Sequence, residues 1–456
     1  MPVSCPRTIV APVKWNLAIV GLSLLLVASC SRRLQGTAVT AAIVFTLIGL
    51  IAGPLVLGEL ELPASGSTVR TLAEATLAIV LFSDASRIRS RELSHELDVP
   101  VRLLGIGLPL TIGLGALAGA ALFSSLSLAE LLLLGVILAP TDAALGQAVV
   151  TDPRLPSRIR QGLNVESGLN DGICVPLLLI FLAAADAEAG IATDQHAIKV
   201  VAEQIGYGIV GGVVAGVGSA ALLALARRHD LITGSWLQVV PVATAALGYG
   251  LASGLGGSGF IAAFVAGAVF GAMRGKEAEQ ASRMSEELAD LLGGVTFLVF
   301  GAILLGPALE HLSLSLVAYA VLSLTIVRMV PVAVAMVGSG ARPQTIAFLG
   351  WFGPRGLASI VFAVTVVEEG HLPGAGTLEL AAYATIGLSV IAHGLTAAPL
   401  AARYARWFAS HPSERLPEME SRPAPMPRPR RLLSQLAEPP AISGHPPPLT
   451  TEDPMP

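Results

Sequence analysis

The sequence predicts an all-α protein that crosses a membrane about thirteen times. Hydrophobic residues make up 53% of the 456 residues and charged residues only 13%, which is more apolar than a soluble core requires. Apolar runs of about 20 residues, the length of a helix that spans about 30 Å of hydrocarbon, recur along the chain. The runs are continuous rather than alternating, which excludes a transmembrane barrel, so each span must be a helix.

Residues 15–407 hold the predicted transmembrane domain. Its spans begin near Trp15, Thr37, Thr68, Val101, Leu128, Gly162, Val200, Trp236, Gly256, Leu288, Leu312, Thr345 and Leu378. Residues 1–14 form a short extension before the first span. Residues 408–456 form a Pro-rich tail that cannot build a core, so we expect this tail to be disordered.

Basic residues gather in alternate loops of the predicted domain. They are Arg32 and Arg33; Arg87, Arg89 and Arg91; Arg154, Arg158 and Arg160; Arg227 and Arg228; Arg274, Lys276 and Arg283; Arg342; and Arg403 and Arg406. Because Lys and Arg favour cytoplasmic loops, an odd number of spans places the N-terminus outside and the tail in the cytoplasm. We expect a multi-pass protein of the cell membrane, which is the inner membrane in a bacterium. The segment LLVASC resembles a lipoprotein cleavage site, but cleavage there would place Cys30 outside, against the loop pattern.

The fifth predicted span, LLLLGVILAPTDAALGQAVV, carries Pro140, Thr141 and Asp142 near its centre. Proline removes a backbone donor and clashes with the preceding turn, which favours a broken helix. The freed carbonyls of a broken helix can face a cation at the membrane midplane, as in transporter sites. The alternative is a kinked structural helix in which Thr141 and Asp142 cap the second half.

The sixth span begins with GLNVESGLNDGICVP, a polar stretch in an apolar run. Ser167 and Asp171 share one helix face, and Glu166 and Asn170 share a neighbouring face about 100° away. Ionisable groups inside a membrane are costly unless paired, so they are functional candidates. One face could hold a cation through a hydroxyl and a carboxylate while the other contacts protein. The alternative is that all four side chains only pair with neighbouring helices.

The twelfth span, FLGWFGPRGLASIVFAV, places Arg355 in the membrane. A guanidinium stays protonated and needs an anionic partner there, and Glu166 is the candidate for a structural ion pair. The Pro-interrupted fifth and twelfth spans are separated by an odd number of crossings, so they run in opposite directions. Paired broken helices of opposite direction predict inverted repeats.

Six stretches, in order along residues 15–406, resemble the NhaP-type monovalent cation:proton antiporters, relatives of the sodium/hydrogen exchangers. They are GLIAGPLVLG, APTDAALGQAVVTDPRLP, LNVESGLNDG, GSGFIAAFVAGAVFG, FLVFGAIL and FGPRGLASIVFA. The resemblance implies an NhaA-like antiporter fold with crossed, unwound helices, present as a homodimer among membrane lipids. It implies a secondary transporter rather than an enzyme, with no cofactor and no nucleic-acid partner.

The resemblance also implies roles for individual residues. Asp171 alternately binds a cation or a proton beside Asn170, while Ser167 and the backbone at Thr141 supply further oxygen ligands. Asp142 compensates the facing helix ends. The Asn-Asp pair implies electroneutral exchange of one cation per proton, and a single carboxylate that must release H⁺ to bind a cation gives that competition. Oxygen-only ligands suit a hard monovalent cation, with Na⁺ expected first and Li⁺ or K⁺ as alternatives.

Two positions depart from the family pattern. Ala143 stands where relatives commonly have Pro after the Thr-Asp pair, which weakens the case for unwinding there. Relatives often read Phe-Glu-Gly in the third span, whereas this chain reads LFSDASRIRS, so the acid is Asp84, one position later. One residue rotates a side chain by about 100° around a helix. Asp84 is therefore either a cation ligand or a cap and partner of Arg87.

Two other functions remain as alternatives. The segment GGSG with Ser258 and the segment AHGL with His393 fit a rhomboid-like intramembrane serine protease. A passive cation channel would move cations without exchanging protons. Cys174 lies three residues beyond Asp171, and we expect it to be a small packing residue; if water reaches it, thiol reagents would block the site.

Overall fold

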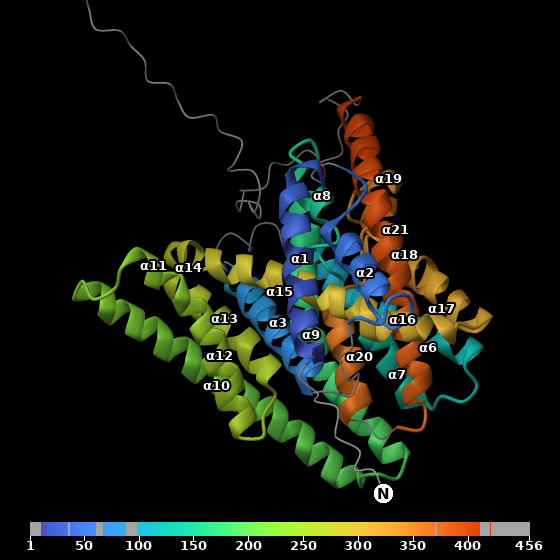
Figure 1. The fold of residues 1–456 in the computed structure, drawn as a ribbon, viewed down its shortest axis with the longest axis horizontal. Coiled ribbons are helices and arrows are strands. Elements are labelled where there is room, and N and C mark those ends of the chain that lie inside the picture. The colour runs from blue at the N-terminus through green and yellow to red at the C-terminus, as the bar shows by residue number, and fades with distance from the viewer. Residues whose placement is uncertain are drawn as a thin grey trace, which may run out of the picture.

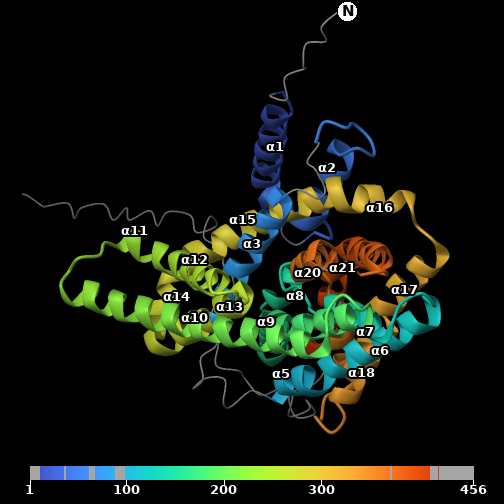
Figure 2. The ribbon, with the colours of Figure 1, turned by 90° about the horizontal axis from the view of Figure 1, so that it is seen from below.

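The computed structural model describes residues 11–34, 37–60, 67–87, 98–369, 372–410 and 420 (Figure 1). All regular secondary structure in this part of the chain is helical, as the sequence predicts. The helices form two groups that lie side by side when the molecule is viewed from below (Figure 2). One group contains the two interrupted spans, and the candidate site residues lie at these interruptions.

The crossing group contains the interrupted spans and their neighbours. It comprises α5 (Asp98–Arg102), η1 (Leu103–Gly107), α6 (Leu108–Leu122), α7 (Leu128–Ile137), α8 (Gln147–Val150), α9 (Ser157–Glu188), α17 (Leu314–Leu324), α18 (Ile326–Ala335), α19 (Pro343–Trp351), α20 (Leu357–Glu369) and α21 (Ala375–Ala409). Within it, α7 packs on α6 and α9, and α21 packs on α17 and α20. The segment η1 is a short π-helical part of the span that continues into α6.

The flanking group packs along two adjoining sides of the crossing group (Figure 2). It comprises α2 (Ala41–Ala52), α3 (Ser67–Ser86), α10 (Asp194–Arg228), α11 (Gly234–Leu237), α12 (Val239–Gly254), α13 (Gly259–Arg274), α14 (Lys276–Ala281), α15 (Arg283–Val299), η2 (Phe300–Leu305) and α16 (Gly306–Glu310). Helix α1 (Ala11–Leu34) packs on α2. Contacts of α3 and α13 with α9, and of α3 with α20, join the two groups.

Small residues allow the flanking helices to approach closely. Gly267 and Gly271 are four residues apart in α13, so they lie on one face of that helix. A Cβ at Gly267 would lie 2.9 Å from the backbone carbonyl carbon of Phe82, and one at Gly271 would lie 2.8 Å from that of Ser86. Helix α13 therefore packs on the backbone of α3, as small residues permit in membrane bundles.

Eight described helices are long and apolar enough to cross a membrane, and four shorter apolar helices, α2, α7, α13 and α20, accompany them. Every predicted span start falls on a described helix or within a few residues of one. Two of the shorter helices, α7 and α20, belong to interrupted spans, each of which continues beyond a break. The total of about thirteen crossings and the orientation of the termini stay predictions.

The predicted tail begins close to the end of α21, at Ala409. One of its residues, Glu420, is described and is only 3% exposed. Its Oε1 accepts hydrogen bonds from the Thr345 hydroxyl at 2.5 Å and from the Arg342 amide at 3.1 Å, at the start of α19. The remaining residues of the tail after Ser410, and residues 1–10, lie outside the described part of the chain.

Candidate functional site

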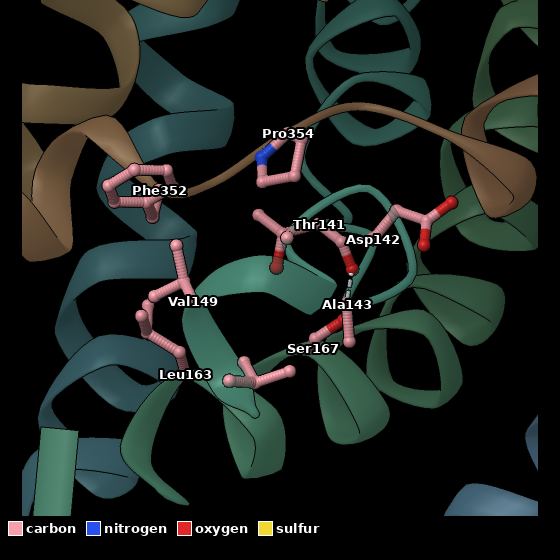
Figure 3. Close-up of a pocket in the computed structure, with 10 residues that line it drawn as sticks. Thr141, Asp142, Ala143, Val149, Leu163, Ser167, Phe352 and Pro354 are labelled. Carbon is pink, nitrogen blue, oxygen red and sulfur yellow. Dashed lines mark hydrogen bonds between the residues drawn. The ribbon is translucent and has the colours of Figure 1, made fainter. Parts of the chain in front are cut away.

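Two unwound segments cross at the centre of the crossing group. The first, residues 138–146, joins α7 to α8, and the second, residues 352–356, joins α19 to α20. The Asp142 amide donates a hydrogen bond to the Pro354 carbonyl at 2.8 Å, which joins the two segments directly. Figure 3 shows the two segments passing one another at Pro354 and Thr141. The predicted crossing of unwound helices is confirmed, and Ala143 in place of Pro does not prevent the unwinding.

The Asp142 carboxylate connects the two segments a second time. Its Oδ1 accepts from the Ala144 amide at 2.7 Å, and its Oδ2 accepts from the Leu357 amide at 3.0 Å. Leu357 is the first residue of α20, where the unpaired N–H groups of a helix carry partial positive charge. Asp142 thus places a negative charge at the start of α20.

Gly356 allows this approach of Asp142. A Cβ added at Gly356 would lie 2.6 Å from the Asp142 Cβ and 2.7 Å from its Cγ. These atoms are close to the backbone rather than at the end of a flexible chain, so a larger residue would have to displace the crossing itself.

Polar side chains of α9 contact the first unwound segment. The Ser167 hydroxyl donates to the Thr141 carbonyl at 2.6 Å, and the Asn170 Nδ2 donates to the Thr141 hydroxyl at 2.7 Å. Asp171 is 7% exposed and follows Ser167 by one turn on the same face of α9. Ser167 and Asn170 therefore contact Thr141 directly, Asp142 follows it in the chain, and Asp171 lies one turn beyond Ser167.

A small pocket opens beside Thr141 and Ser167. It is lined by Thr141, Asp142, Ala143, Gly146, Val149, Val150, Leu163, Ser167, Phe352 and Pro354. In Figure 3 the Thr141 and Ser167 side chains lie at the pocket, between the two unwound segments and α9. Leu163 precedes Ser167 by one turn, so the apolar part of the pocket extends toward the N-terminal end of α9.

The predicted ion pair between Glu166 and Arg355 is wrong. Glu166 pairs instead with Arg328 of α18, with Nη1–Oε1 at 2.6 Å and Nη2–Oε2 at 2.9 Å. The helix spacing correctly predicted that Glu166 and Ser167 lie on different faces of α9. It carried no information on which arginine pairs with Glu166. Arg328 lies in the eleventh predicted span, and the same criterion of a charge inside an apolar run would have marked it.

Arg355 has a different role in the structure. It is fully buried, and its Nη1 donates to the carbonyls of Ala139 at 3.0 Å and Pro140 at 3.4 Å. Those carbonyls follow the end of α7, where a helix carries partial negative charge. Among the described residues no carboxylate lies within salt-bridge distance of this guanidinium, so it compensates backbone dipoles.

Asp84 lies against α9. A Cβ added at Gly168 would lie 3.1 Å from the Asp84 Cβ and 3.6 Å from its Oδ2, so the side chain faces the helix that carries Ser167 and Asp171. Arg87, the alternative partner, forms a salt bridge with Glu286 of α15. The position of Asp84 is therefore compatible with a ligand role, which stays a prediction.

The two residues of the protease alternative belong to different groups of helices. Ser258 caps α13, where its hydroxyl accepts from the Ile261 amide, and its own amide donates to the Gln204 carbonyl. His393 lies in α21, hydrogen-bonded to Ser389 and Trp351. None of the hydrogen bonds in the described part of the chain joins Ser258 to His393.

The sequence profile of the transmembrane sodium/hydrogen exchanger family matches residues 20–403 of this chain. The chain belongs to the sodium/hydrogen exchanger family. The resemblance predicted from the sequence is confirmed, and the protein is a multi-pass membrane protein. The protease alternative is wrong, because the chain matches secondary transporters rather than enzymes.

Individual relatives and a solved structure agree with the family assignment. The K(+)/H(+) antiporter NhaP of Alkalimonas amylolytica is 28% identical over 400 residues, which cover 86% of this chain and 67% of the relative. The K(+)/H(+) antiporter NhaP2 of Shewanella sp. (strain ANA-3) is 26% identical over 373 residues, covering 79% and 62%. This exchanger-family chain thus spans about two thirds of the length of these relatives.

The fold is shared with the sodium proton antiporter MjNhaP1 from Methanocaldococcus jannaschii. Its structure at pH 8 superposes with a TM-score of 0.66 at 21% identity, covering 85% of this chain and all of that one. The match confirms the predicted antiporter fold for this member of the exchanger family.

Proposed function

We propose that this chain exchanges one monovalent cation for one proton at Asp171, by alternating access. One observation carries the proposal: Asp171 is buried one turn from Ser167, whose hydroxyl contacts the Thr141 carbonyl in an unwound segment. A carboxylate, a hydroxyl and a backbone carbonyl are then the oxygen donors that a hard monovalent cation requires.

Competition at one carboxylate would couple the two fluxes. An ionised Asp171 is costly to bury unless a cation or a proton neutralises it. Only the cation-bound and the protonated protein therefore change between the outward-facing and inward-facing states. Asn170 donates its amide to Thr141 and does not titrate, so the pair offers a single proton site. One cation then replaces one proton, and the exchange is electroneutral.

The fixed charges around the site support this stoichiometry. Asp142 lies at the positive start of α20 and Arg355 at the negative end of α7, so each charge is matched by a helix end. Glu166 and Arg328 neutralise one another. The charge that changes during transport is therefore confined to Asp171 and, if it approaches the cation, Asp84.

The choice of cation is part of the proposal. Na⁺ is the ion expected first from the sequence, while two relatives carry the name K(+)/H(+) antiporter, so K⁺ is tested beside it. We also propose a homodimer in the cell membrane, with the N-terminal end of α9 and the tail on the cytoplasmic side. The basic residues Arg158 and Arg160 at that end of α9 support this orientation.

The test uses purified protein in proteoliposomes with an imposed pH gradient. Adding Na⁺, Li⁺ or K⁺ should dissipate the gradient with wild type and not with Asp171→Asn. Glu203→Gln, which alters a surface carboxylate of α10 paired with Lys199, is the matched control and should transport normally. An electroneutral exchanger should be indifferent to a potassium–valinomycin clamp of the membrane potential at constant cation gradient.

Two results would count against the proposal. Cation flux that proceeds without proton counterflow would indicate a channel. Full activity of Asp171→Asn would show that another residue exchanges the proton, with Asp84 next to be tested.

A further inference from the structure

The unwound segment 352–356 has backbone groups that need partners inside a buried region. The Gly353 amide donates to the Trp351 carbonyl at 2.9 Å, and Pro354 has no amide hydrogen. The Arg355 amide donates to the Ser389 hydroxyl at 2.6 Å. Ser389 belongs to α21 and is fully buried, so a neighbouring helix supplies the acceptor for the amide of the functional arginine.

His393 follows Ser389 by one turn of α21 and contacts the other end of the same segment. Its Nδ1 is 3.1 Å from both the hydroxyl and the backbone carbonyl of Ser389, and its Nε2 is 3.0 Å from the carbonyl of Trp351, the last residue of α19. Carbonyls only accept, so each ring nitrogen faces an acceptor, and the neutral ring can donate from Nε2 to Trp351 or from Nδ1 to Ser389. The Ser389 hydroxyl therefore contacts both the Arg355 amide and the His393 ring.

These contacts form one continuous chain of hydrogen bonds. It runs from the Arg355 amide through Ser389 and His393 to the Trp351 carbonyl, and so spans the break between α19 and α20. The Trp351 indole adds a third contact to α21, donating to the Thr396 hydroxyl at 2.9 Å. His393 is 1% exposed, so water does not replace these partners when one is removed.

We infer that Ser389 and His393 are positioning residues, which hold both ends of the second unwound segment in register with the cation site. The segment carries two contacts that depend on its position: Arg355 on the Ala139 carbonyl, and the Pro354 carbonyl on the Asp142 amide. Asp142 follows Thr141 in the chain. A shift of segment 352–356 therefore also shifts the Thr141 carbonyl, which accepts from the Ser167 hydroxyl. In the described part of the chain, the side-chain hydrogen bonds of Ser389 and His393 go to Arg355, to one another and to Trp351.

The consequence for transport rests on the proposed function, so it is tested together with a measurement that does not need transport. Ser389→Ala removes the acceptor for Arg355, and His393→Leu removes both links of the histidine. His393→Gln places a side-chain amide near the position of Nε2, and His393→Asn places one near the position of Nδ1. Ser359→Ala is the control, because Ser359 in α20 is equally buried and its hydroxyl has no hydrogen-bond partner in the described structure.

The first readout is amide hydrogen exchange of residues 352–357 in the full-length, reconstituted protein. Ser389→Ala and His393→Leu should speed exchange in this segment about fivefold, the factor that one net hydrogen bond is worth. Ser359→Ala should leave it unchanged. Unchanged exchange in both positioning variants would overturn the inference, whatever the protein transports.

The second readout is the cation concentration at half-maximal transport, measured on variants matched for amount and thermal stability. Ser389→Ala and His393→Leu should raise it about fivefold while the maximal rate changes less, because the site is loosened rather than removed. The Gln and Asn variants should fall between these and wild type. Equal losses in Ser359→Ala, or a wild-type half-saturation in both positioning variants, would overturn the inference. If the wild-type protein transports no cation but amide hydrogen exchange responds to the variants as expected, the proposed function fails and the positioning role stands.

Discussion

Glu166 of α9 and Arg328 of α18 form a bidentate ion pair in which both residues are about 2% exposed. The pair joins a helix of the first half of the crossing group to a helix of the second half. Gly353 leaves room for it, since a Cβ there would lie 2.8 Å from the Arg328 Cζ. The ion pair therefore fixes the distance between α9 and the second unwound segment.

Breaking this pair from one side should destabilise the protein severely. Removing one partner leaves the other charge buried and uncompensated, at a cost of about 3–5 kcal/mol. Thermal unfolding in detergent should show this for Glu166→Ala and for Arg328→Ala. Glu166→Leu combined with Arg328→Leu should unfold at a higher temperature than either single variant. If the single variants unfold like wild type, the pair does not hold the two helices together.

The sequence was sufficient to predict the arrangement of the site but not its pairings. Pro140 and the Gly-Pro-Arg-Gly stretch at Gly353 marked both breaks, and helix spacing put Ser167 and Asp171 on one face of α9. Which arginine meets Glu166 depends on the packing of α18 against α9, and spacing within one helix carries no information on that. Arg328 and Arg355 both lie in apolar runs, so the criterion of a charge inside the membrane does not decide which of them pairs with Glu166.

The positioning role of Ser389 and His393 could not be predicted from the sequence for a related reason, although His393 stood out there as a candidate protease base. Their importance arises only when the break in one span leaves an amide without a partner and another span supplies it. Serine and histidine four residues apart in an apolar helix give no signal of that. The sequence left Asp84 as either a cation ligand or a partner of Arg87, and the structure places its side chain against α9 at Gly168.

Gly356 should tolerate no larger side chain. An added Cβ would lie 2.6 Å from the Asp142 Cβ, so Gly356→Ala must separate the two unwound segments. We expect at least a tenfold loss of transport at equal protein amount, roughly the effect of 1.4 kcal/mol. Gly250→Ala in α12 is the control, since nothing lies within 4 Å of its added Cβ and alanine favours a helix. An active Gly356→Ala would mean that the crossing adjusts without cost.

Arg70 should influence the balance between access states more than stability. It pairs with Glu74 of its own helix α3 at 2.6 Å and reaches Glu368 of α20 at 3.4 Å, so it joins the flanking group to the crossing group. Such partly exposed pairs contribute about 1 kcal/mol or less, which shifts a two-state equilibrium by up to about fivefold. Arg70→Gln should therefore change the cation concentration at half-maximal transport by up to about fivefold when the cation is added on one side of the membrane. The melting temperature should change little.

The control for Arg70 lies within a single helix. Lys199→Gln breaks a pair with Glu203 one turn away in α10, which cannot respond to movement between groups. It should leave half-saturation unchanged on both sides of the membrane. Equal effects of the two variants, or an Arg70→Gln effect identical from both sides, would show that the contact with Glu368 does not distinguish access states.

Cys174 should be unreactive in the folded protein. It is fully buried on α9, three residues beyond Asp171, whereas Cys30 near the end of α1 is exposed. In variants that keep one cysteine each, a maleimide should label Cys30 within minutes and Cys174 only after denaturation, and the Cys174-only protein should keep its transport during treatment. If Cys174 is labelled rapidly and added cation suppresses the labelling, water reaches this turn of α9. The path to Asp171 would then include a side of the helix that is closed in the structure.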